Sequence, residues 1–145
     1  MKKSKAWSGA FVCIFNISFS KTLLLERKSS KKTEKAEGWG NIGGSIESGE
    51  TPLRACVREV EEEIGVRIEP KALKLVQIKK SDISEPQSYV IHFFSTPIEE
   101  GTPIKLDGET HSYKWFSLKR LPSRLMDDSK DIIKWRNLAL SKKNQ

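Results

Sequence analysis

The segment Gly44–Val66, GSIESGETPLRACVREVEEEIGV, constrains the fold most, because it specifies one helix together with both of its ends. Thr51 can cap the first turn through its hydroxyl, and Pro52 suits the first helical position, where a missing N–H has no cost. Gly65 supplies the stop, since glycine readily adopts the left-handed conformation found at helix ends. We therefore predict a helix over residues 52–64.

The predicted helix has an apolar stripe and an acidic face. The stripe recurs at spacings of four, three and four residues and consists of Leu53, Val57, Val60 and Ile64. Cys56 borders it. At about 100° per residue, Glu59, Glu62 and Glu63 fall within roughly 100° of one another, away from the centre of the stripe. Three carboxylates are therefore expected to converge.

Carboxylates at helix spacings of three and four repel one another unless a positive charge offsets them. Hard cations such as Mg²⁺ take oxygen ligands, usually a few carboxylates together with water and substrate phosphates. Such a cation beside a phosphoanhydride polarises the phosphoryl group and activates water. The acidic face therefore predicts a divalent-cation site and hydrolysis of a phosphate–phosphate bond.

The segment fits the pattern G-x5-E-x7-R-E-U-x-E-E-x-G-U, in which U is apolar, and thereby resembles the Nudix hydrolase box. The residues at the defined positions are Gly44, Glu50, Arg58, Glu59, Val60, Glu62, Glu63, Gly65 and Val66. An accidental match has a chance on the order of one in a hundred million per starting position. The resemblance implies an α/β fold, a Nudix-type α/β/α sandwich with a mixed β-sheet, and a substrate in which a nucleoside diphosphate is linked to another group.

The resemblance also implies roles for single residues. The implied metal ligands are the backbone carbonyl of Gly43 and the carboxylates of Glu59, Glu62 and Glu63. Mg²⁺ is the implied cofactor, with Mn²⁺ as an alternative. Glu62 is either a ligand or the base that activates water, and Arg58 is expected to orient the carboxylates by bonding Glu50 or Glu62.

Further candidates lie outside the box. Glu109 stands six residues before a Trp-Phe pair, where members of the family often carry another acid, and it is either a ligand or base or a solvated loop acid. Trp39, just ahead of the glycine pair, is predicted to pack under the loop, the alternative being a stack on a nucleobase. His92 and His111 are expected to have no catalytic role, since water activated by a metal needs neither.

Two departures from the family concern the glycine loop and the substrate. Ile42 stands where relatives usually have proline before the two glycines, so the loop is expected to be less rigid. The offsets at which dinucleoside-polyphosphate hydrolases carry Tyr hold Ile83 and Ser84, and those at which ADP-ribose hydrolases carry Pro hold Ser81 and Asp82. The coenzyme A signature is absent too. These absences favour a MutT-like enzyme that cleaves a nucleoside triphosphate to a monophosphate and pyrophosphate.

The charge of the chain adds a second substrate hypothesis. Lys and Arg number 26 against 19 acids, a formal charge of +7, which attracts anions such as nucleotides or RNA. Arg27, Lys28 and the lysines of the polar loop 28–37 are candidate contacts for substrate phosphates, the alternative being a merely solvated loop. An enzyme acting on triphosphorylated or capped RNA 5′ ends is therefore one alternative. A nucleotide-sensing module without turnover is another.

The chain as a whole fits one domain, residues 1–145, with basic tails expected to be mobile. Cys13 and Cys56 lie within apolar patterns, which favours reduced thiols and a cytoplasmic location. No apolar run approaches the 18 or so residues of a membrane span. The oligomeric state is left open between monomer and homodimer.

Outside the box, hydrophobic patterning predicts five strands and a second helix. The predicted strands cover residues 10–17, 22–26, 72–79, 88–95 and 113–116. Residues 38–44 hold four glycines and are predicted to form a turn in which the backbone closely approaches another group. The second helix is expected from Asp127 or Asp128 to Leu140.

Overall fold

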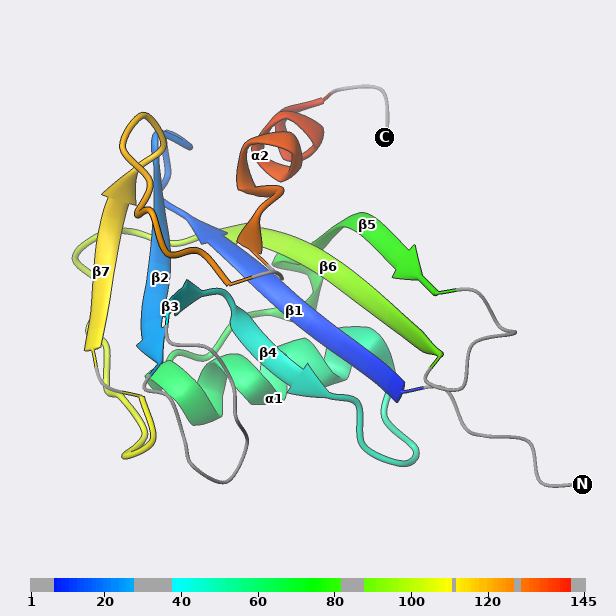
Figure 1. The fold of residues 1–145 in the computed structure, drawn as a ribbon. Coiled ribbons are helices and arrows are strands. Elements are labelled where there is room, and N and C mark those ends of the chain that lie inside the picture. The colour runs from blue at the N-terminus through cyan, green and yellow to red at the C-terminus, as the bar shows by residue number, and fades with distance from the viewer. Residues whose placement is uncertain (1–6, 28–37, 82–87, 111, 127–128, 142–145) are drawn as a thin grey trace, which may run out of the picture.

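The computed structural model describes residues 7–27, 38–81, 88–110, 112–126 and 129–141. Within these ranges it contains seven strands, two α-helices and one 3₁₀ turn (Figure 1). The strands are β1 (Trp7–Phe15), β2 (Lys21–Arg27), β3 (Gly38–Gly40), β4 (Ile42–Ser45), β5 (Lys74–Lys80), β6 (Tyr89–Pro97) and β7 (Ser112–Ser117). The helices are α1 (Pro52–Ile64) and α2 (Ile132–Leu140), and the 3₁₀ turn is Pro70–Ala72. The five predicted strands are present as β1, β2, β5, β6 and β7, with ends shifted by one to three residues.

The described strands form one mixed sheet in the order β3-β2-β1-β6-β5, with β4 paired to β1 and β7 paired to β2. β1 and β6 are parallel along the whole of β1, and the other pairs are antiparallel. Because β6 occupies one edge of β1, β2 and β4 share the other edge. β1 and β2 therefore diverge beyond their connecting turn, and β3 and β4 fill the wedge between them (Figure 1).

The glycine-rich segment 38–44 lies in this wedge and forms two short strands instead of the predicted turn. Gly38 is opposite Arg27 on β2, and Gly43 is opposite Phe11 on β1. Glycine favours turns locally, but two neighbouring strand edges offer this backbone its hydrogen bonds, and sheet context overrides local preference. The turn prediction was therefore wrong.

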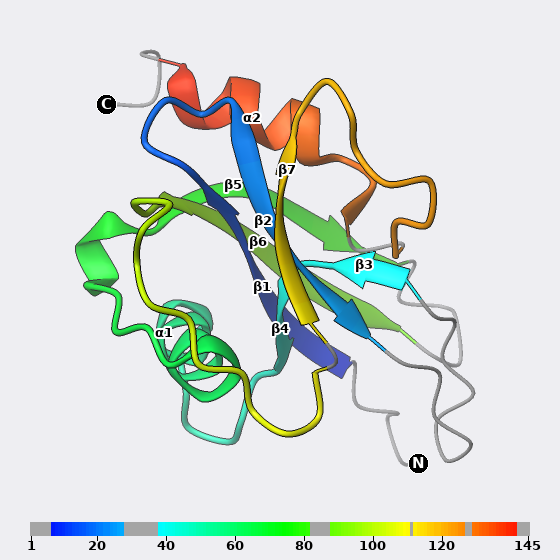
Figure 2. The same ribbon diagram turned by 90° about the vertical axis from the view of Figure 1, so that its left-hand side faces the viewer.

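The two helices cover opposite faces of the sheet, which confirms the predicted α/β/α sandwich (Figure 2). Alternation along β1 divides the interior into two cores. Ala10, Val12 and Ile14 belong to the core beneath α1, whereas Cys13 and Phe15 belong to the core beneath α2. β1 is thus the central strand to which both helical layers are anchored.

The helix predicted over residues 52–64 matches α1 at both ends. Thr51 Oγ1 accepts a hydrogen bond from the N–H of Arg54 at 3.2 Å, and Gly65 ends the helix with a φ of 70°. The buried stripe is shifted from the predicted one, because Leu53 and Val57 are only half-buried. The buried residues are Ala55, Cys56, Val60, Glu63 and Ile64. One of the acidic side chains therefore lies on the covered side of the helix.

α2 begins at Ile132, after the predicted start at residues 127–128, which lie outside the described residues. Its anchor is Trp135, which is fully buried. The Trp135 ring stacks on Phe93 with centroids 4.6 Å apart, and its Nε1 donates to Gln77 Oε1 at 2.8 Å. Neither described helix is long and apolar enough to cross a membrane.

Both cysteines are buried, and Cys56 makes a pH-dependent stability prediction possible. Burial raises the pKa of the Cys56 thiol from 9.0 to about 12, with smaller contributions from the charges of Glu59 and Glu50. The unfolded thiol ionises above pH 9 while the folded thiol stays protonated, so the native state loses stability as pH rises from 9.

We expect the free energy of unfolding to fall between pH 9 and 10 more steeply in the native protein than in Cys56→Ala, by up to about 1.4 kcal/mol per pH unit. Urea denaturation at a series of pH values measures both slopes. Parallel slopes in the two proteins would contradict the prediction.

Candidate active site

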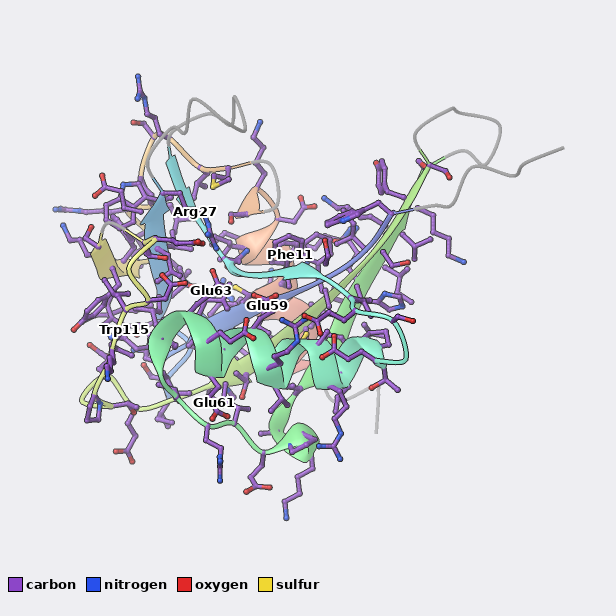
Figure 3. All side chains as sticks on the ribbon, turned by 90° about the horizontal axis from the view of Figure 1, so that it is seen from below. Phe11, Arg27, Glu59, Glu61, Glu63 and Trp115 are labelled. Carbon is purple, nitrogen blue, oxygen red and sulfur yellow. The ribbon has the colours of Figure 1, made fainter. Side chains whose placement is uncertain are left out.

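Four acidic side chains of the box gather where α1 passes beneath β4. Figure 3 shows Glu59 and Glu63 on the side of α1 that faces β4, and Glu61 on the opposite side. The exposed fraction of the side chain is 57% for Glu62, 19% for Glu50, 14% for Glu59 and 7% for Glu63. The carboxylates therefore run from solvent into the interior instead of forming one exposed acidic surface.

Arg58 connects most of this cluster. Its Nε donates to Glu50 Oε2 at 2.7 Å and its Nη2 to Glu50 Oε1 at 3.0 Å, a bidentate pair. Its Nη1 donates to Glu59 Oε1 at 3.0 Å and to Glu62 Oε2 at 3.2 Å, and Nη2 also reaches the carbonyl of Ser45 at 3.1 Å. The predicted contact with Glu50 or Glu62 is thus made with both. The bond from Arg58 is the main cause that lowers the pKa of the Glu50 carboxyl.

Glu63 is the deepest of the four, and both of its oxygens are bonded. Arg27 Nη2 donates to Oε1 at 2.5 Å, and the N–H of Gly43 donates to Oε2 at 3.0 Å. Burial raises the pKa of Glu63 to about 7, against the opposing effect of Arg27, and the neighbouring Glu59 raises it further. Burial therefore favours the protonated form of this carboxyl group, and the positive charge of Arg27 favours the ionised form.

Gly43 and Gly44 allow β4 to run closely between β1 and α1. A Cβ on Gly43 would lie 2.3 Å from the carbonyl oxygen of Ala10 and 2.4 Å from Phe11 Cδ1. A Cβ on Gly44 would lie 2.9 Å from Glu59 Oε1. The predicted close approach of this backbone to another group is confirmed, and one of the groups approached is a carboxylate of the box.

The chemistry of this cluster fits a hard divalent cation. Its donors are oxygen atoms, and the charge of Glu59 raises the pKa of Glu63, so a divalent cation would stabilise the two ionised carboxylates. Arg27 and Arg58 bond these carboxylates in the structure. Among the described residues, no three His, Cys, Asp or Glu side chains already form a metal-binding group. In this structure the two guanidinium groups therefore supply the positive charge beside these carboxylates.

The Trp39 ring packs against Phe116 of β7, while packing under the glycine loop stays a prediction. The backbone N–H of Trp39 donates to the carbonyl of Arg124 at 2.8 Å. The backbone carbonyl of Trp39 accepts from the N–H of Met126 at 2.9 Å. The Trp39 ring meets the Phe116 ring edge-on, with centroids 4.9 Å apart. Trp39 therefore ties β3 to the segment that precedes α2, while a stack of its ring on a nucleobase stays a prediction.

Glu109 lies two residues after Asp107, whose backbone N–H donates to the backbone carbonyl of Glu63 at 3.3 Å. Glu109 is exposed on the segment before β7, where its N–H donates to Asp107 Oδ1 at 3.1 Å, and its role stays a prediction. His92 lies half-buried on β6, and its Nδ1 has no hydrogen-bond partner among the residues described. Lys28 and His111 are outside the described residues.

The ion pair between Arg27 and Glu63 was not predicted from the sequence. Arg27 was a candidate contact for substrate phosphates, and that role stays a prediction. In the structure its guanidinium bonds Glu63, which lies 36 positions further along the chain. A signal was available, since Arg27 follows Leu23 and Leu25 at strand spacing and so lies on the face that α1 covers. Strand spacing does not reveal which helical residue lies opposite.

Comparisons with known proteins agree with this fold. The family model described as the NUDIX domain matches residues 7–136. The chain is 32% identical over 98 residues to a protein of Methanocaldococcus jannaschii named ADP-ribose pyrophosphatase, covering 66% of this chain and 57% of that relative. It is 31% identical over 125 residues to the putative 8-oxo-dGTP diphosphatase of Bacillus subtilis, covering 86% of this chain and 76% of that protein.

A solved structure, the MutT NUDIX hydrolase of Burkholderia pseudomallei, superimposes with a TM-score of 0.72 at 23% identity, over 90% of this chain and 98% of that one. This likeness supports the fold. The family model covers most of the chain, including the complete box, the sheet and the start of α2. The chain therefore belongs to the Nudix hydrolase family.

Proposed function

We propose that this protein hydrolyses a phosphoanhydride bond in a nucleoside diphosphate linked to another group, with Mg²⁺ or Mn²⁺ as the cofactor. The observation that carries the proposal is the placement of Glu59 and Glu63 on the side of α1 that faces β4, with Arg58 bonded to Glu59 and Glu62. Membership of the Nudix hydrolase family supports the reaction class.

In the proposed mechanism, Glu59, Glu63 and the carbonyl of Gly43 would hold the divalent cation, and Glu62 would either join them or act as the base. When bound, the cation would supply positive charge to the phosphate oxygens and make water more acidic. The water oxygen forms a bond to phosphorus, the phosphoanhydride P–O bond breaks, and the water proton passes to a carboxylate. Glu62 suits this last role because its side chain is 57% exposed, so solvent can reach it.

Arg58 has a positioning role in this proposal. Its side chain is 22% exposed and its donors are committed to carboxylates and to the carbonyl of Ser45, so it is not directed at a substrate. A planar guanidinium bonded to several carboxylates fixes their separation before the substrate arrives. The substrate phosphates would meet carboxylates already held in place.

The proposed substrate class is a nucleoside triphosphate, which would be cleaved to a monophosphate and pyrophosphate. The name of the B. subtilis relative and the absence of other substrate signatures support this choice. The name of the M. jannaschii relative favours ADP-ribose as a second candidate. The match covers 57% of the length of that relative. Residues in its unmatched part that select its substrate are therefore not compared with this chain.

A substrate panel with product identification tests this proposal. Purified protein with Mg²⁺ is offered nucleoside triphosphates, including 8-oxo-dGTP, and in parallel ADP-ribose and 5′-triphosphorylated RNA. We expect a nucleoside monophosphate and pyrophosphate in a 1:1 ratio from a triphosphate, with turnover abolished by a chelator. Hydrolysis in ¹⁸O-labelled water identifies the phosphorus that is attacked.

Each arm of the panel has a distinct meaning. Preference for ADP-ribose would replace the substrate class and keep the chemistry. Preference for RNA, with a rate that falls steeply as salt rises, would favour the RNA 5′-end enzyme. Tight nucleotide binding without turnover would favour a sensing module, and no turnover with any substrate would overturn the proposal.

A further inference from the structure

The two arginines of the active site make very different contacts. Arg58 lies on α1 and spreads its donors over three carboxylates and a backbone carbonyl. Arg27 is the last residue of β2. Its Nη2 donates to one carboxylate oxygen, Glu63 Oε1, at 2.5 Å, and makes a longer contact of 3.5 Å with the carbonyl of Asn41. Arg27 is therefore the principal positive partner of the most buried acid in the cluster.

The environment of Glu63 leaves little room for a second positive group. Its side chain is 7% exposed, its Oε1 is bonded by Arg27, and its Oε2 is bonded by the N–H of Gly43. A divalent cation beside Oε1 would stand within a few ångströms of the guanidinium, where like charges repel strongly because water screens them poorly. The guanidinium and a metal ion would therefore compete for Oε1.

We propose that Arg27 is a resident counter-cation of Glu63, which occupies this carboxylate while no metal is bound and leaves it when a divalent cation binds. The inference rests on the proposed function, because it takes Glu63 as a metal ligand. Arg27 thereby competes with the metal, and its release is coupled to metal binding. Its guanidinium is then available to the anionic substrate.

The structure gives Arg27 the freedom that this exchange needs. Its backbone is held in the sheet opposite Gly38, so only the side chain has to move. The Arg27 side chain is 30% exposed, against 7% for Glu63, so the arginine can rotate towards solvent while the carboxylate stays in place. Competition of this kind is reciprocal and typically changes affinity by about 5–150-fold.

Isothermal titration with Mg²⁺ at pH 8.5 tests the competition without any assay of activity. Arg27→Gln removes the competing charge, and we expect it to bind Mg²⁺ at least about fivefold more tightly than the native protein. Arg27→Lys keeps a positive charge that can reach Glu63 and should restore an affinity close to native. The matched control is Arg67→Gln, because Arg67 is 82% exposed and its nearest acid, Glu61 at 3.8 Å, lies on the far side of α1.

The side chain of Arg27 can also be followed directly. Its Nε–H signal in ¹⁵N nuclear magnetic resonance is assigned by its loss in Arg27→Gln. We expect this signal to move towards the position of a solvated guanidinium when Mg²⁺ is added. Circular dichroism of each variant verifies that it is folded before the titration.

The outcomes separate this inference from the proposed function. The counter-cation role of Arg27 is supported if Arg27→Gln binds Mg²⁺ more tightly than both Arg67→Gln and the native protein. Equal or weaker binding by Arg27→Gln overturns it and leaves the proposed function standing. Failure of the native protein and of every variant to bind Mg²⁺ or Mn²⁺ overturns both.

Discussion

Glu63→Gln is expected to lower kcat for phosphoanhydride hydrolysis by on the order of 10²–10³-fold. Glu63 is the most buried acid of the cluster and shares its side of α1 with Glu59 (Figure 3). The amide keeps the shape of the carboxylate but loses its negative charge, so the site would hold a divalent cation with one anionic ligand fewer. The substrate that gives the highest turnover in the panel is used to measure kcat at saturating Mg²⁺.

The matched control is Glu61→Gln. The Glu61→Gln substitution removes one negative charge from the same helix. The side chain of Glu61, however, is 51% exposed and points away from the cluster. We expect its kcat to stay within about twofold of the native value, since surface substitutions away from a site have small effects. A Glu63→Gln enzyme that is folded and retains more than a tenth of native kcat would contradict the metal-ligand role of Glu63.

Arg58→Lys is expected to lower kcat/KM by about 10–100-fold, the range found when residues that orient metal ligands are replaced. Lysine keeps the charge, but a single ammonium cannot reproduce the bidentate pair with Glu50 and the bonds to Glu59 and Glu62 at the same time. The carboxylates would lose their fixed separation. Steady-state kinetics as a function of Mg²⁺ concentration measure both kcat/KM and the metal dependence.

A positioning role for Arg58 predicts more than a loss of rate. The Mg²⁺ concentration that gives half-maximal activity should rise in Arg58→Lys, because the metal then has to order the carboxylates itself. Arg54→Lys is the control, since Arg54 is an exposed arginine one helical turn earlier. An unchanged Mg²⁺ dependence with an unchanged rate in Arg58→Lys would reject the positioning role.

Local chemistry made α1 predictable from the sequence. Its first and last turns are specified by Thr51, Pro52 and Gly65, whose backbone preferences act within a few residues. The contact of Arg58 with Glu62 is likewise local, because residues four apart on a helix are neighbours. The same reasoning identified the acids of the box, while their roles in catalysis stay predictions.

Long-range pairing decided the parts that the sequence left open or suggested wrongly. Residues 38–44 became β3 and β4 because β1 and β2 diverge and expose edges that need partners. The side of α1 that carries Glu63 is buried because β4 packs on it, although helical periodicity placed this acid away from the apolar stripe. The sheet, not the helix, determined which acid is desolvated.

By itself, the sequence of this protein determined the family, the boundaries of α1 and the acids that gather on it, because all of these depend on residues within one helix and one loop. Only the tertiary structure decided that Arg27 on β2 meets Glu63 on α1, that the N–H of Gly43 bonds the same carboxylate, and that these acids differ in burial. The physical reason is that charge, desolvation and hydrogen bonding at the box depend on which strands lie over the helix. That arrangement is a property of the folded sheet.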